Sequence, residues 1–460
     1  MTREGTRSEG TRAEGTRAEG TRLVGARLAD YTAAVLASIS PLRPIRMTFD
    51  DAHGCTLAED VVATAPLPPY DISVIDGYAV KAADVASATA DHPVVLPVVA
   101  DINANSRGPV TVLDGYSVRV SAMSRVPVGA ETIVPLEATD GGVASVTVRT
   151  AAAHGAGIRP AGCEVADRAT VLDSGQVLGV AQLALLAAMG RREALCYPRA
   201  RVVVVTATAP DAGLGAHGRG DGRGDGRGDG RGDGRGDGRG DGRGDGRGDG
   251  ISHALSAGVR EAGGIAYRVG AISDPHEMLT TLEDHLIRAD MMLVCGGATL
   301  GPNGPRGVLP DVLSALGTVT FTPIAARPLG FVGFGTIGPD AIPFFAVPSD
   351  PASALVAFEF LVGPAIRLMA AAQAAFQSDE ATLTDSVTST HGICDLVPVR
   401  INSTGPRSVP TATPLIASGG QPPLYLLAAA DGLAILDEDW TDIPTGSAVR
   451  VMLFDKHADR

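Results

Sequence analysis

The chain has 460 residues, 45% of them apolar, which is enough for about two to four domains. Its formal net charge of −14 argues against a general nucleic-acid-binding surface. No uncharged apolar run reaches the roughly 18 residues that span a bilayer, and the five cysteines form no CxxC pair. We therefore predict a cytoplasmic protein with no nucleic-acid partner, no membrane partner and no structural zinc site.

The N-terminal part of the chain is predicted to hold a tail and two small subdomains. Residues 1–22 repeat a polar five-residue unit, EGTRS EGTRA EGTRA EGTRL, which has almost nothing to bury and predicts a disordered tail. Residues 23–190 follow as a linker and two subdomains. They are predicted to contain a helix through YTAAVLASIS, short strands with many turns, and a helix over GVAQLALLAAMG (179–190).

Residues 199–372 have the alternating pattern of an α/β domain. Apolar runs predict strands at 201–208, 265–272, 291–297, 318–325 and 341–347. Helical spacing and capping residues predict helices at 251–264, 274–290, 307–317 and 351–373. Strands that alternate with helices imply a parallel sheet, in which ligands bind beyond the strand C-termini.

A second repeat interrupts this domain. Residues 218–250 are eight copies of GRGD closed by Gly250, and a run so rich in glycine with balanced charges predicts a flexible inserted loop. The embedded Arg-Gly-Asp tripeptides suggest an adhesion role, but tandem repeats arise easily by replication slippage and we find no export signal. We therefore interpret the run as an inert loop.

The C-terminal residues 378–456 read as strands separated by Gly/Pro turns, which is typical of a small β-barrel or sandwich. The predicted fold class is thus a multi-domain α/β protein. It combines β-rich α+β domains, an α/β domain with a mainly parallel sheet, and a small C-terminal β domain.

Two loops at the predicted strand ends of the α/β domain are candidate ligand sites. GGATLGPNG places Gly296, Gly297 and Gly301 after a buried strand, where backbone amides can approach an anion, although a glycine-rich loop alone is weak evidence. VPSDPASAL places Asp350 before a helix, where an N-cap is the simpler interpretation. Histidines show no HExxH spacing, and GxSxG and P-loop motifs are absent.

The stretch PPYDISVIDGYAV (68–80) holds two acids, Asp71 and Asp76. Asp-Gly dipeptides usually form turns, in which glycine accepts a positive φ. The alternative is that Asp76 forms the acidic corner of an active site.

Six blocks in this order resemble the molybdopterin molybdenumtransferase (MoeA) family, whose members include the E domain of gephyrin. The family block that ends in MDGYAV is matched by LAEDVVATAPLPPYDISVIDGYAV (57–80). Its P-x-GAD-x-VV stretch is matched by VPVGAETIVPLE (126–137), and its N-x-R-x-x-GED block is matched by GIRPAGCEV (157–165). The family's SGGVSVG motif corresponds to CGGATLG (295–301), and its LPGNPVSAL motif corresponds to VPSDPASAL (347–355). Its C-terminal SG…LA-x-ANGL stretch corresponds to residues 418–438.

The resemblance implies an elongated four-domain subunit that forms a homodimer. In it a MogA-like α/β domain (199–372) binds molybdopterin, the domains within 23–190 form the substrate cleft, and residues 378–456 form a β-barrel. It implies that adenylylated molybdopterin and molybdate react in a Mg²⁺-dependent step that releases AMP. By this resemblance Asp76 is the catalytic candidate, and the candidate substrate-binding residues are Gly296, Gly297, Gly301, Arg327, Pro348, Asp350, Ser353 and Glu164. No metal ligand can be assigned.

The sequence departs from the family at positions that carry charge. The TGDEL motif reads Thr206 to Pro210 without its acids, the acid after SGGVSVG is Gly304, and the KPGKP segment runs from Arg327 to Phe331 with Gly330 for its second lysine. Asp350 replaces the Asn of LPGNP. Fewer carboxylates weaken a Mg²⁺ site. Two hypotheses therefore stay open: an active molybdenum insertase, or a catalytically impaired paralogue that acts as a molybdopterin-binding or scaffold protein.

Overall fold

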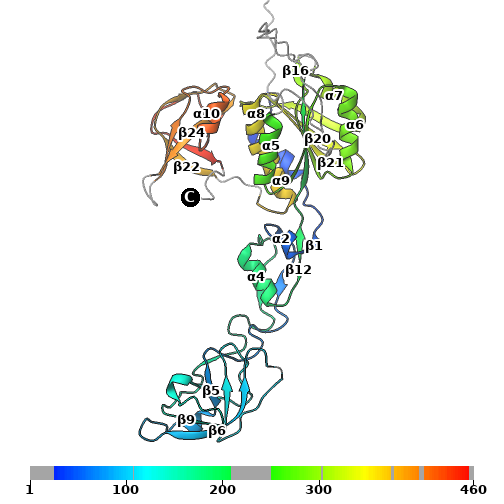
Figure 1. Ribbon diagram of the computed structural model, residues 1–460. Coiled ribbons are helices and arrows are strands. Elements are labelled where there is room, and N and C mark those ends of the chain that lie inside the picture. The colour runs from blue at the N-terminus through cyan, green and yellow to red at the C-terminus, as the bar shows by residue number, and fades with distance from the viewer. Residues whose placement is uncertain are drawn as a thin grey trace, which may run out of the picture. The chain divides into compact units, whose positions relative to one another are not determined.

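The computed structural model describes residues 25–106, 108–208, 250–301, 304–373, 378–403 and 409–454 (Figure 1). The N-terminal repeat and the GRGD repeat lie outside these residues, except for Gly250, which begins helix α5. The described residues form two compact units. One contains residues 25–40, 200–369 and 373–454, and the other contains residues 41–199 with 370–372.

The unit of residues 41–199 has a first core around a three-stranded antiparallel sheet in the order β1-β12-β2. The leucines Leu57, Leu178 and Leu186 are fully buried in this core. Its elements are β1 (Ile45–Thr48), α2 (Phe49–Ala52), β2 (Thr56–Leu57), β3 (Val61–Val62), β11 (Thr170–Leu172), α4 (Val180–Ala188) and β12 (Glu193–Tyr197).

A second core in the same unit surrounds a five-stranded sheet in the order β8-β5-β7-β6-β9. Side chains alternate between its faces, so Tyr78 and Val134 enter one cluster while Ala79 and Ile133 enter another. Its elements are β4 (Ile72–Ser73), β5 (Gly77–Val80), α3 (Ala82–Val85), β6 (Val94–Ile102), β7 (Ser117–Val120), β8 (Thr132–Pro135), a 3₁₀ turn (Leu136–Ala138), β9 (Ser145–Val148) and β10 (Ile158–Arg159).

Met123, in the loop after β7, has a left-handed backbone with φ 62° and a side chain that is 60% exposed. A non-glycine residue in this region costs about 1–2 kcal/mol, and glycine's larger unfolded-state entropy offsets part of the gain from relieving it. Met123→Gly should therefore raise the free energy of unfolding by about 0.5–1 kcal/mol, measured as the urea midpoint. Met123→Ala keeps the Cβ and should change stability little, so equal effects of the two substitutions would contradict the strain.

The α/β domain contains a six-stranded sheet in the order β14-β13-β15-β21-β20-β18. The strands are β13 (Arg201–Ala207), β14 (Ile265–Ile272), β15 (Met291–Gly296), β18 (Gly317–Pro323), β20 (Phe331–Ile337) and β21 (Ile342–Val347). β14, β13, β15 and β21 are parallel, as predicted. These pairings confirm the predicted mainly parallel sheet. The sequence did not predict β20, which pairs antiparallel with β18 on one side and with β21 on the other and so runs opposite to both, because the connections from β18 through β20 to β21 are too short for a crossover helix.

Helices cover both faces of this sheet, with α6 and α7 on one side and α5, α8 and α9 on the other (Figure 1). Val202 to Val205 of β13 and Met291 to Val294 of β15 are fully buried, which confirms the interpretation of continuous apolar runs as strands covered on both faces. The helices are α5 (Gly250–Glu261), α6 (Pro275–Leu286), α7 (Val308–Leu316), α8 (Pro351–Ala357) and α9 (Gly363–Met369).

A π-helical segment (Phe358–Val362) joins α8 to α9, where the sequence predicted one regular helix. Pro364 lies two residues after this segment, and its missing N–H cannot complete an α-helical hydrogen bond. The whole segment Pro351–Met369 is, among the described residues, the one helix long and apolar enough to cross a membrane, but 78% of its apolar window is buried inside the structure. It is therefore a core helix of the α/β domain.

The C-terminal domain is a barrel in which β24, β25, β22, β28 and β26 pair in sequence and β26 closes onto β24. This confirms the predicted β-barrel. Its elements are β22 (Ser378–Leu383), β23 (Val387–Thr388), β24 (Cys394–Asn402), β25 (Thr411–Pro414), α10 (Leu424–Ala429), β26 (Gly432–Leu436), β27 (Asp442–Ile443) and β28 (Ala448–Leu453). β19 (Ala326–Arg327) of the α/β domain adds a parallel partner to β24.

Helix α1 (Leu28–Ala37) belongs to the same unit as the α/β domain, whereas the sequence grouped it with residues 23–190. Ala26 just before it pairs in parallel with Ile324, and the helix packs against α9 and the π-helical segment. These contacts are made with residues about 300 positions later in the chain, so no local pattern could indicate them.

Candidate functional site

Asp76 lies on an exposed loop of the 41–199 unit, directly before β5. Its Oδ1 accepts a hydrogen bond of 2.8 Å from the Ala122 N–H. Asp71, on the same loop, is also exposed, and its Oδ1 accepts from the Ala161 N–H at 2.8 Å. Each carboxylate is thus oriented by one backbone donor while it stays open to solvent.

Backbone contacts hold the loop between the two acids. The Ser73 N–H donates to Ser124 O at 2.9 Å, and the Met123 N–H returns a bond to Ser73 O at 2.7 Å. Gly77 begins β5 in extended pairing with β7 and β8, and an added Cβ there would collide with Val134 O. The predicted role of glycine in a positive-φ turn is therefore wrong, because Gly77 is required by close strand packing.

Glu164 lies near this loop and forms an ion pair of 2.5 Å with Arg159, with both side chains about two-fifths exposed. Arg159 pairs with Ile72 in the β10–β4 ladder, and Arg125 bridges to Ile72 from the other side. The Arg125 guanidinium lies 5.1 Å from the centre of the Tyr70 ring. The sequence reasoning did not single out either arginine, although Arg159 lies inside a quoted block.

Gly296 and Gly297 form the turn at the end of β15 with φ of 83° and 72°. A Cβ on Gly296 would lie 2.6 Å from Ala207 O, and one on Gly297 would lie 2.5 Å from the Ala207 Cβ. Both glycines are therefore needed to turn the chain against the end of β13. That need is structural: Gly296 is buried and Gly297 is half-buried.

Gly301 lies in a short hairpin of β16 (Thr299–Gly301) and β17 (Gly304–Arg306). The Arg306 side chain lies over Gly301, with its Nε 2.9 Å from where a Cβ would be. Arg306 is exposed and places a positive charge in a loop where the family resemblance implied one acid, at the position of Gly304. The sequence reasoning missed this residue; an arginine inside a Gly/Pro loop after a buried strand was the available signal.

Asp350 is the N-cap of α8, as predicted: its Oδ2 accepts from the Ser353 N–H at 2.9 Å and from the Ser353 hydroxyl at 2.8 Å. Pro348 and Ser353 are buried beside it. Pro348 O accepts from the Cys295 thiol at 3.2 Å. Burial raises the pKa of that thiol to about 12, and the nearby Asp350 charge acts in the same direction. Cys295 is therefore neutral and structural.

Arg327 is held by the C-terminal barrel. Its Nε donates to Asp395 Oδ1 at 2.7 Å, and a terminal nitrogen donates to Asp395 Oδ2 at 2.6 Å and to Thr390 Oγ1 at 3.0 Å. Asp395 is fully buried, whereas the Arg327 side chain is 33% exposed. Much of the guanidinium is thus committed to an internal ion pair.

The structure brings some of the predicted residues together. A Cβ added to Gly296 would lie 3.3 Å from the Ser349 Cβ, so the glycine-rich loop and the residues just before α8 are neighbours. Asp76 and Glu164 belong to the other compact unit. Over the described ranges, no group of three or more His, Cys, Asp or Glu side chains gathers as a metal site. The residues present therefore do not form a ready Mg²⁺ site.

Comparisons with known proteins agree with this architecture. Residues 26–190 match a family model described as MoeA N-terminal region (domain I and II), and residues 240–368 match one described as a probable molybdopterin binding domain. A solved structure of a molybdopterin biosynthesis moeA protein from Pyrococcus horikosii aligns with a TM-score of 0.69 at 22% identity, over 93% of this chain and 99% of that one.

Two relatives come from Mycobacterium tuberculosis. The chain is 34% identical to molybdopterin molybdenumtransferase 1 over 72% of this chain and 75% of the relative. It is 30% identical to molybdopterin molybdenumtransferase 2 over 92% of this chain and 98% of the relative. The second likeness covers nearly the whole length of both chains.

Proposed function

Because this chain belongs to the molybdopterin molybdenumtransferase (MoeA) family, we propose that it inserts molybdenum from molybdate into adenylylated molybdopterin and releases AMP. It is a transferase of molybdenum cofactor biosynthesis. The observation that carries the proposal is the likeness along nearly the whole chain, to relatives named for this transfer. The alternative of a catalytically impaired scaffold protein is not favoured by these relatives.

Asp76 is the proposed catalytic residue. Its carboxylate is exposed and has one oxygen fixed by the Ala122 N–H, so it can orient water or a cation at the adenylate phosphate. Mg²⁺ often binds through one or two carboxylates together with substrate phosphates. Asp76 would supply one such carboxylate if the ion is held mainly by the substrate phosphates.

We propose that the pterin and its phosphates contact residues at the strand ends of the α/β domain. Gly296, Gly297 and Gly301 would offer backbone amides, and Pro348, Asp350 and Ser353 would shape the neighbouring wall. The Arg327 side chain, which is 33% exposed, would contact the anionic groups of the substrates. Glu164, already paired with Arg159, is a further proposed substrate-binding residue.

We further propose a homodimer in the cytoplasm. In helix α4 Leu186 is the buried residue, while Val180 is 78% exposed and the preceding Val177 is 53% exposed. An apolar helix open to water suits a subunit contact. Four of the five cysteines are buried and all five are free, which is compatible with a reducing compartment. Sedimentation equilibrium measures the subunit number directly.

The function is tested by incubating the purified protein with adenylylated molybdopterin, molybdate and Mg²⁺, and following AMP release and loading of a molybdenum-free apoenzyme. We expect turnover. Binding of adenylylated molybdopterin without AMP release would instead support the scaffold alternative. Expression in a strain that lacks its own insertase, with nitrate reductase as readout, is the matching test in cells.

A further inference from the structure

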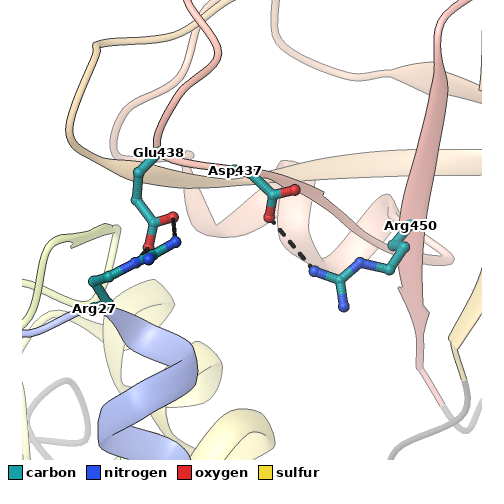
Figure 2. A network of polar contacts seen from close by, with 4 residues as sticks. All are labelled: Arg27, Asp437, Glu438 and Arg450. Carbon is teal, nitrogen blue, oxygen red and sulfur yellow. Dashed lines mark hydrogen bonds and ion pairs between the residues drawn. The ribbon is translucent and has the colours of Figure 1, made fainter.

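The C-terminal barrel meets the α/β domain along a seam made by three chain segments. Ala26 pairs with Ile324, and Ala326 and Arg327 pair with Cys394 and Asp395 of the barrel. Arg27, next to Ala26, donates to Glu438 of the barrel at 3.0 Å (Figure 2). That hydrogen bond lowers the pKa of Glu438, so the pair is charged at neutral pH.

Asp395 lies at the centre of the seam. Its carboxylate accepts from Arg327 at 2.7 and 2.6 Å and from the Ser389 hydroxyl at 2.6 Å. The loop that begins at Ser418 passes so close to this carboxylate that a Cβ on Gly419 would collide with Asp395 Oδ2. The buried ion pair therefore fixes the course of the loop around Gly419.

Two residues later the same loop reaches the start of α8. The Gln421 Nε2 donates to Ser353 Oγ at 3.0 Å, and Ser353 Oγ donates to Asp350 Oδ2 at 2.8 Å. A hydroxyl has one proton. Because Gln421 can only donate through its amide nitrogen, the Ser353 proton is left for Asp350. The three side chains form a directional hydrogen-bond chain from the barrel into the α/β domain.

From these contacts we infer that Gln421 is a positioning residue of the substrate site: it fixes the Ser353 hydroxyl and, through it, the Asp350 carboxylate. The inference rests on the proposed function, in which Asp350 and Ser353 shape the wall that meets the pterin. Gln421 does not touch the reacting atoms in this role. It acts on substrate binding and leaves the chemical step to other residues.

Two substitutions separate the donor from the shape of the side chain. Gln421→Met keeps the length and removes the donor. A hydrogen bond worth about 1 kcal/mol corresponds to about fivefold in affinity, so the KM for adenylylated molybdopterin should rise about fivefold. Gln421→Glu keeps the shape but places an acceptor-only charge against Ser353 and Asp350, so its KM should rise about tenfold or more.

The same experiment measures three further quantities. The kcat of both variants should stay within about twofold of the unaltered protein, and so should the KM for molybdate. Gln421 is exposed, so both variants should melt within about 2 °C of the unaltered protein. Gln176→Met is the matched control, because Gln176 is an exposed glutamine bonded to Asp173 at 3.4 Å. It should leave every parameter unchanged.

The outcomes distinguish this inference from the function on which it rests. Turnover by the unaltered protein, with an unchanged KM for adenylylated molybdopterin in both variants, overturns the positioning role and leaves the function standing. A fall in kcat with unchanged KM also overturns it. If the unaltered protein neither binds adenylylated molybdopterin nor releases AMP, the proposed function fails, and the inference fails with it.

Discussion

Replacing Asp395 by alanine should lower the free energy of unfolding by about 3 kcal/mol, because the Arg327 guanidinium then loses its carboxylate partner. The Asp395 side chain is fully buried and accepts both hydrogen bonds from Arg327. The loss lies at the low end of the range for buried pairs, since Arg327 is 33% exposed and water screens part of its charge.

Denaturant unfolding and hydrogen exchange of the β24 amides measure this loss. Asp437→Ala is the control: its ion pair with Arg450 spans 3.4 Å between exposed side chains within the barrel (Figure 2), and its removal should cost less than about 1 kcal/mol. The double variant Asp395→Leu with Arg327→Met should recover part of the stability, because it removes both charges. Equal losses for Asp395→Ala and Asp437→Ala would refute the buried pair as the main contact of the seam.

Replacing Asp76 by alanine should lower kcat about a hundredfold or more, the usual range for a general acid–base group. Its carboxylate is exposed and makes one backbone hydrogen bond, so the stability of the fold should change by no more than about 1 kcal/mol. Asp76→Asn keeps an oxygen for the Ala122 N–H and removes the charge. It should lose activity to a similar extent, which would assign the effect to the charge.

Asp71 is the matched control for Asp76. It lies on the same loop, is exposed, and accepts one backbone hydrogen bond of the same length, 2.8 Å. Asp71→Ala should therefore cost the same stability while kcat stays within about threefold. Steady-state AMP release gives kcat, and urea unfolding gives the stability. If the two alanine variants lose equal activity, the loop as a whole matters and Asp76 has no special role.

The local elements of the α/β domain were predictable because their signals are short in range. Asp274 caps α6 by accepting from the Glu277 N–H at 2.8 Å, with Pro275 at the first helical turn, as the sequence indicated. The N-cap at Asp350 and the buried strand at 201–207 were read in the same way. Such features depend on a few neighbouring residues. The order of the domains was instead predicted from the resemblance of the ordered blocks to the family.

Contacts between distant residues were not predictable in this way. Arg327 looked like an isolated charge after a strand, yet it binds Asp395, 68 positions later. Gln421 had no assigned role, yet it bonds Ser353, also 68 positions away. A turn was one of two interpretations of the Asp76-Gly77 pair, whereas the reason for glycine at position 77 is the close approach of β8.

The sequence by itself thus determined the fold class, the α/β domain with its glycine loop and caps, the family, and Asp76 as the acid to test. Only the tertiary structure decided that Arg327 belongs to a buried ion pair, that α1 packs with the α/β domain, and that the barrel loop reaches Ser353 and Asp350. The physical reason is that propensity, capping and hydrophobic period act over a few residues, whereas ion pairs and domain contacts depend on which distant surfaces pack together.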